Sequence, residues 1–184
     1  MLNTRQVNTF PVNRMNKFKI SLLLQCLVFL IPVNIYVIGD WLGTGVQWVL
    51  FRYQQTYLGN SLILITREIT FVLSGTISGR SAISIALWAI GVLLFIIATV
   101  LVILANVRED SPLIKKASVF TITGGIIIAV SILVQYGFLL NSQSGFTLPI
   151  GIPIILIIGW WMNQKTDDSL ETDNETDDNN SGPE

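Results

Sequence analysis

Residues 81–107 read SAISIALWAIGVLLFIIATVLVILANV and hold no charged residue between Arg80 and Arg108. A hydrocarbon core about 30 Å thick needs roughly 20 apolar residues of helix, so this stretch, beginning near Ala82, is long enough to span a membrane. The whole chain is similar: 51% of its 184 residues are apolar, 12% are charged, and the mean hydropathy is +0.62. In soluble domains, roughly a quarter of all residues are charged. The sequence therefore predicts an integral membrane protein.

Uncharged runs elsewhere in the chain predict three more spans. One precedes Asp40, and the uncharged run between Lys116 and Lys165 is long enough for two helices. Polar residues at 141–145 are typical of the turn between them. The predicted fold class is an all-α integral membrane protein with four transmembrane helices. The expected spans are 20–38, 82–105, 119–140 and 146–162, within a membrane domain that covers 20–162.

The distribution of Lys and Arg predicts the orientation, because short cytoplasmic flanks carry an excess of these residues. With four spans, eight of the eleven Lys and Arg residues fall on one side of the membrane. They lie in the basic segment 1–19, between the second and third spans, and at Lys165. The other side receives Arg52, Arg67 and Arg80. We therefore expect a multi-pass protein of the cell membrane with both termini in the cytoplasm. A cleaved signal peptide is the alternative for the N-terminal apolar run.

The segment 40–80 is expected to lie outside the membrane, between the first two spans. Its apolar residues recur at helical spacing at Val46, Val49, Leu50, Tyr53 and Tyr57. This spacing predicts an amphipathic helix in the headgroup layer. Residues 61–74 are rich in β-branched side chains, so helix and strand both remain open there. A re-entrant hairpin is a further alternative, whereas the charges of Arg67 and Glu68 argue against a fifth span.

The composition changes abruptly after Lys165. Residues 166–184 contain eight carboxylates and one large apolar side chain. Such a segment cannot bury enough apolar surface to fold. We therefore predict that residues 163–184 form a disordered acidic tail in the cytoplasm.

The residue types present exclude several chemistries. The chain has no His and only one Cys, Cys26, so Ser-His catalysis, thiolate zinc sites and internal disulfides are excluded. The predicted spans hold none of the ionisable residues that mark ion pathways, which argues against a pump or an ion-coupled transporter. We expect no catalytic residue, no cofactor, no metal site and no nucleic-acid partner. The residue types therefore favour a protein that is not an enzyme.

The first functional hypothesis is a non-catalytic subunit, scaffold or assembly factor of a membrane complex. Small residues at four-residue intervals, Thr121, Gly125 and Ala129, form a stripe suited to close helix packing. The expected partners, besides the lipid bilayer, are other membrane-protein subunits or a second copy of the chain.

The second hypothesis is a lipid-handling enzyme or carrier. Arginine binds phosphate through its planar guanidinium, so Arg52, Arg67 and Arg80 would hold an anionic headgroup at the outer face. Glu68 is the acidic residue nearest to these arginines in the sequence, and we expect it to form a structural ion pair with Arg67 or Arg80. A channel or transporter remains a third reading.

Overall fold

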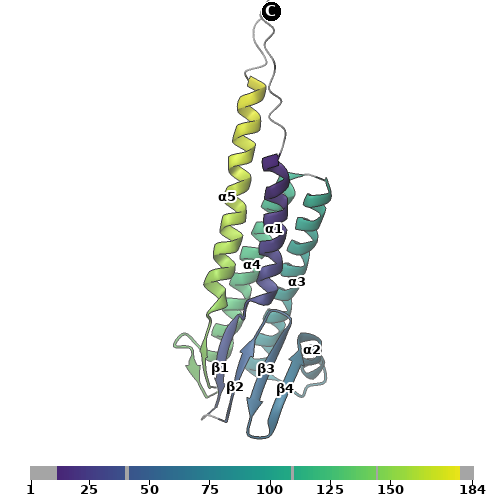
Figure 1. Ribbon diagram of the computed structural model, residues 1–184. Helices are drawn as coiled ribbons and strands as arrows, with labels where there is room; N and C mark the ends of the chain where they lie inside the picture. Colours follow the sequence, from purple (N-terminus) through teal and green to yellow (C-terminus); the bar gives the residue numbers. More distant parts are fainter. Residues whose placement is uncertain (1–11, 40–41, 109, 144, 179–184) are drawn as a thin grey trace, which may run out of the picture.

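The computed structural model describes residues 12–39, 42–108, 110–143 and 145–178. In chain order the described elements are α1 (Val12–Leu30), β1 (Asn34–Ile38), β2 (Gly43–Gln47), β3 (Phe51–Thr56), β4 (Gly59–Leu64), α2 (Ile65–Leu73), α3 (Gly79–Arg108), α4 (Ser111–Tyr136), β5 (Asn141–Ser142), β6 (Gly145–Leu148) and α5 (Gly151–Asp178). The four long helices form a bundle, and the strands form a sheet at one of its ends (Figure 1). The prediction of an all-α, four-span membrane protein is therefore wrong.

The strands of the described residues form one antiparallel sheet in the order β4-β3-β2-β1-β6-β5. The first four are joined by consecutive hairpins, whereas β6 comes from the connection between α4 and α5. It pairs with β1, with Tyr36 opposite Thr147. On its other side, Tyr36 is opposite Gly45, and a Cβ at Gly45 would lie 2.4 Å from the Tyr36 hydroxyl oxygen. Glycine is thus required where the tyrosine ring crosses the sheet.

The amphipathic helix predicted at residues 46–58 is instead parts of β2 and β3, so this expectation and the re-entrant hairpin are both wrong. Along β3, Arg52, Gln54 and Thr56 are less exposed than Tyr53 and Gln55, which is the period of two of a half-buried strand. The same residues also have helical spacing, but they form strands because β2 pairs with β1 and β3 pairs with β4. Local periodicity carries no information about such distant partners.

The predicted first and fourth spans extend into residues that form strands. Pro32 follows the end of α1 at Leu30, and proline has no N–H with which to continue a helix. Residues 34–38, which were assigned to the first span, form β1, and residues 146–148, assigned to the fourth, belong to β6. Within the two predicted spans, the helices therefore cover only residues 20–30 and 151–162.

The long C-terminal helix α5 continues to Asp178, where a disordered tail was expected from residue 163. The backbone is therefore helical over most of the predicted tail. Residues 179–184, like residues 1–11 of the basic N-terminal segment, lie outside the described residues.

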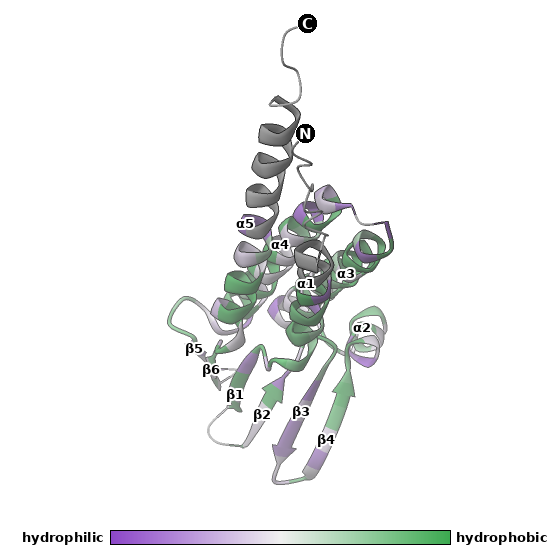
Figure 2. Cartoon of the chain, turned by 45° about the horizontal axis from the view of Figure 1, so that its top comes forward, coloured by the Kyte–Doolittle hydropathy of each residue, from purple (hydrophilic) through white to green (hydrophobic). Residues whose placement is uncertain are grey.

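Within the described ranges, two helices are long and apolar enough to cross a membrane by length and composition, namely α3 and α4. Shorter apolar stretches, Lys19–Leu30 in α1 and Gly151–Gln164 in α5, run beside them. Figure 2 shows the hydrophobic residues extending along the bundle and onto several strands of the sheet.

The packing stripe predicted on α4 faces the neighbouring helices. Thr121 is buried and donates a hydrogen bond to Gln25 Oε1 of α1 at 2.9 Å. A Cβ at Gly125 would lie 3.2 Å from Ile155 of α5, and Ala129 packs against the core. The small residues therefore let α4 approach helices of the same chain.

We predict that Gly91→Leu lowers stability by about 1–3 kcal/mol, because a larger side chain overpacks the contact between α3 and α4. Even a Cβ at Gly91 would lie 2.5 Å from Ile128 Cγ1. Ala86 of the same helix is exposed, so Ala86→Leu is the matched control. Thermal unfolding in detergent micelles compares the two. Equal unfolding temperatures would contradict close packing at Gly91.

Candidate functional site

A cavity of about 230 Å³ lies between the inner face of the sheet and the adjoining ends of α3 and α4. Three strands and both helices contribute to its wall. Its polar lining includes Asn34, Tyr36, Gln47, Arg52, Ser81 and Gln135. Trp88, Ile85 and Ile132 supply apolar surface. The cavity therefore combines polar groups from the sheet with both polar and apolar groups from the helices.

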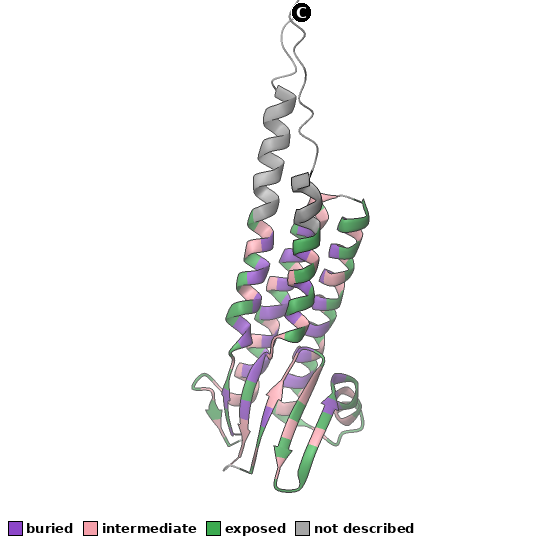
Figure 3. Cartoon of the chain, in the orientation of Figure 1, coloured by how far each residue is buried: buried purple, intermediate pink, exposed green. Residues whose placement is uncertain are grey.

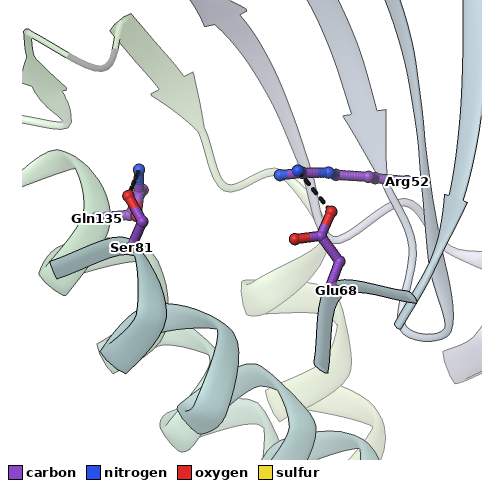
Figure 4. Close-up of polar contacts among 4 residues, drawn as sticks. All are labelled: Arg52, Glu68, Ser81 and Gln135. Atoms are coloured by element: carbon purple, nitrogen blue, oxygen red, sulfur yellow. Dashed lines mark hydrogen bonds and ion pairs between the residues drawn. The ribbon is translucent and has the colours of Figure 1, made fainter. Parts of the chain in front are cut away.

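An ion pair links the sheet to α2 beside this cavity. Arg52 Nη2 lies 2.5 Å from Glu68 Oε1; the arginine side chain is 29% exposed and the glutamate side chain is fully buried. β4 leads directly into α2, and Arg52 is opposite Ile63 on β4, so the first turn of α2 brings Glu68 back over the arginine. Figure 4 shows the second carboxylate oxygen pointing away from the guanidinium, toward the side where Ser81 and Gln135 lie.

The carboxyl group of Glu68 is shaped by two opposing effects. Burial removes water from the carboxylate and raises its pKa above the usual 4.5, while the positive charge of Arg52 lowers it. Burial is the larger effect, and Arg67 contributes a smaller lowering. The pair is therefore held in place against a considerable cost of desolvation.

Several buried polar atoms around the cavity have no hydrogen-bond partner among the described residues. Three belong to residues that line it, Asn34 Oδ1, Tyr36 Oη and Arg52 Nε, and the fourth is Oε2 of Glu68, the ion-pair partner of Arg52. Buried polar groups in proteins are nearly always hydrogen-bonded, since leaving one unpaired costs about 1–3 kcal/mol. These unpaired atoms make the cavity the candidate binding site of the described residues.

Other polar groups of the lining are already paired. The hydroxyls of Ser84 and Ser131 lie 3.0 Å apart, and Gln135 Nε2 donates to Ser81 Oγ at 3.2 Å. Trp88 Nε1 donates to the carbonyl of Val49 at 2.9 Å. The first two contacts join α3 to α4, and the third joins α3 to the turn between β2 and β3. The unpaired atoms are therefore concentrated on the sheet and α2.

Of the three arginines predicted to bind an anion, only Arg52 lines the cavity. Arg67 is exposed, and its guanidinium lies 5.3 Å from the centre of the Phe71 ring. Arg80 is also exposed and donates from Nε to the carbonyl of Val134. The partner of Glu68 is Arg52, not the neighbouring Arg67 that the sequence suggested.

Sequence reasoning assigned no binding role to Asn34 or Tyr36. The available signal was a polar residue, Asn34, inside an apolar run, which we attributed to the first span. Its place in the cavity depends on β1 lying in the middle of the sheet, and no local pattern in the sequence indicates that position.

The outer face of the sheet is apolar and uncovered. The outward-facing apolar residues are Ile35, Val37, Val46, Phe51, Tyr53, Leu62, Leu64, Phe146 and Leu148. We call them the outer apolar face. Leu62 is 57% exposed and Leu148 is 50% exposed. The outward-facing positions of the described strands include no charged residue, and Figure 3 shows exposed residues recurring along them.

Comparison with models of known protein families and with curated proteins finds no match to this chain.

We predict that Arg52→Met destabilises the protein by about 3 kcal/mol, the low end of the range for breaking a buried ion pair, because Glu68 would lose its partner. The double variant Arg52→Met/Glu68→Leu should recover most of this loss, since no buried charge remains. Arg67→Met, on the exposed face of α2, is the matched control and should change stability little. Chemical unfolding in detergent measures all three, and a double variant no more stable than Arg52→Met would contradict the pairing.

Proposed function

We propose that the protein is an integral membrane protein in which α3 and α4 cross the bilayer, with α1 and α5 packed beside them. In the most apolar 18-residue stretches of α3 and α4, only 33% and 44% of the residues are buried within the protein. Large apolar side chains such as Leu93 and Ile126 are exposed on these helices. Lipid is the solvent in which such a surface is stable.

The charges of the bundle support an orientation with the sheet on the outside. Lys19, Arg108 and Lys116 lie at the end of the bundle away from the sheet, where cytoplasmic residues are expected by the excess of Lys and Arg. α1 begins and α5 ends at that same end (Figure 1). We therefore propose a multi-pass topology with both termini in the cytoplasm.

We further propose that the protein is a non-catalytic subunit that associates with a second copy of itself through the outer apolar face. The observation that carries this proposal is the exposed apolar surface of the sheet. In the proposed topology the sheet lies outside the membrane, in water. Apolar surface in water costs roughly 25 cal/mol per Å², so a patch across five strands favours a partner.

A second copy suits this face because the face is uncharged and therefore complementary to itself. Two sheets pack face to face about 10 Å apart when apolar side chains interdigitate between them. Polar residues of the same face, Thr44, Gln55 and Asn60, lie in a row farther from the bundle. They would form the rim of the contact, while Ile35, Val46 and neighbouring apolar residues would form its centre.

The geometry gives less support to the binding of an anionic headgroup. Arg52 is the one predicted arginine that lines the cavity, and Glu68 already balances its charge. A phosphate bound there would place further negative charge beside the buried carboxylate. Arg67 and Arg80 contact Phe71 and Val134 instead.

We predict that a cysteine at Thr44 reacts with a membrane-impermeant maleimide on intact cells, and that a cysteine at Lys116 reacts only after permeabilisation. Both positions are exposed, and they lie at opposite ends of the bundle. The native Cys26 is replaced by Ser in both variants. The reverse labelling pattern, or equal labelling of both variants on intact cells, would contradict the proposed topology.

We predict that Ile35→Lys converts a dimer of the wild-type protein into monomers, because it places a charge at the centre of the outer apolar face. Thr44→Lys introduces the same charge on the same face but in the polar row, so it should leave the dimer intact. Native mass spectrometry of protein extracted into mild detergent gives the stoichiometry. Thermal unfolding confirms that both variants are folded.

Self-association would be overturned by a wild-type protein that is monomeric after gentle extraction, or by an Ile35→Lys variant that keeps the wild-type stoichiometry. Stoichiometric recovery of a different membrane protein, released by Ile35→Lys but retained by Thr44→Lys, would also overturn the self-association while assigning the face to another subunit.

A further inference from the structure

We propose that the cavity beneath the sheet binds a neutral, polyhydroxylated group, of the kind presented by a sugar or a glycolipid headgroup. The inference is independent of self-association, because it concerns the opposite face of the sheet. It rests on the unpaired atoms of the cavity, on the balance of its charges and on its apolar walls.

The unpaired atoms require a ligand that both donates and accepts hydrogen bonds. Asn34 Oδ1 is an acceptor, and Arg52 Nε is a donor. Glu68 Oε2 accepts when the carboxylate is ionised, and the hydroxyl of Tyr36 does either. A hydroxyl group donates one hydrogen bond and accepts others, so several hydroxyls on one molecule satisfy the three atoms that belong to lining residues, those of Asn34, Tyr36 and Arg52.

The charges of the site favour a neutral ligand. Among the described residues, Arg52 is the charged residue that lines the cavity, and its ion pair with Glu68 balances its charge. A bound cation or anion would therefore keep an unbalanced charge in a largely buried site, at a high cost of desolvation. A polyol brings no charge and avoids this cost.

The apolar walls give a polyol a second kind of contact. The side chains of Trp88, Ile85 and Ile132 face the same space as the polar groups of the sheet. Carbon-bound hydrogens of a sugar ring or a glycerol unit pack against such surfaces while the hydroxyls reach the polar side. Binding sites for small molecules typically combine apolar walls with a few convergent polar groups in this way.

The size and position of the cavity suit the same ligand. Its 230 Å³ corresponds to nearly eight water molecules at about 30 Å³ each, which is room for a glycerol unit or a single sugar ring. The half-buried residues Gln47 and Arg52 connect it with the surface. In the proposed topology it lies at the outer end of α3 and α4, within reach of a lipid headgroup or a soluble sugar.

The decisive experiment compares probes of different charge on the full-length protein in phosphatidylcholine nanodiscs. The soluble probes are glycerol, methyl glucoside, inorganic phosphate and choline, and binding is followed by saturation-transfer NMR and calorimetry. A second set of nanodiscs contains a glucosyl diacylglycerol, whose retention is followed by native mass spectrometry. We expect saturable binding of a neutral probe or selective retention of the glycolipid; the first identifies a soluble ligand and the second a headgroup.

Asn34→Leu removes the unpaired acceptor and should weaken the binding at least about tenfold, the effect of losing one well-made hydrogen bond in a buried site. Asn60→Leu, the same exchange at an exposed position on β4, is the matched control and should bind as the wild type does. Tyr36→Phe removes a single hydroxyl and serves as the second variant if Asn34→Leu fails to fold.

Three results would overturn the proposal. The first is saturable binding of phosphate or choline without binding of a neutral probe or glycolipid, which would contradict the charge argument. The second is no binding of any probe, which would leave the cavity to water. The third is neutral binding that neither Asn34→Leu nor Tyr36→Phe weakens, which would place the ligand elsewhere. Loss of self-association in Ile35→Lys bears on none of these results.

Discussion

The pairing of β1 with both β2 and β6 is the constraint on which the rest of the structure depends. β1 follows α1 after a short link, and β6 precedes α5, so this pairing fixes the adjacent ends of two helices that lie more than a hundred residues apart. Two backbone hydrogen bonds extend it into the links: Val33 N–H donates to Gln47, and Gly151 N–H donates to the Val33 carbonyl. The close approach at Gly151, where a Cβ would lie 2.2 Å from Pro32 O, leaves no room for a side chain.

This constraint also creates the cavity. Because β1 lies in the middle of the sheet, Asn34 and Tyr36 are covered on both sides by neighbouring strands and from one face by α3 and α4. Their polar atoms are therefore buried without a partner, whereas the same residues on an edge strand would meet water. The Arg52–Glu68 pair closes the neighbouring side by tying α2 to β3. Unpaired polar atoms in a rigid setting are costly, so their place in the fold calls for a physical explanation.

The sequence was sufficient to predict what short-range patterns determine. The uncharged run at 81–107 indicated α3, and the run after Lys116 indicated α4, because length and hydropathy alone define such helices. The sheet was missed because its strands are short and its pairings join residues far apart, as Ile35 and Leu148 show. Arg52 and Glu68 were each singled out, but their contact depends on the hairpin between β3 and β4 and on the first turn of α2. No spacing in the sequence encodes that geometry.

The two faces of the sheet have opposite chemistry, and the period of two along each strand keeps them separate. On β1, Asn34 and Tyr36 enter the cavity, while the alternate residues Ile35 and Val37 belong to the outer apolar face. A shift of register by one residue would exchange them, placing Ile35 against the buried polar groups and Asn34 in the apolar surface. The inward Gly45 favours the observed register, since it leaves room for the Tyr36 ring where a side chain would not. The proposed ligand site and the proposed association surface therefore use different residues of the same strands, so either can change without the other.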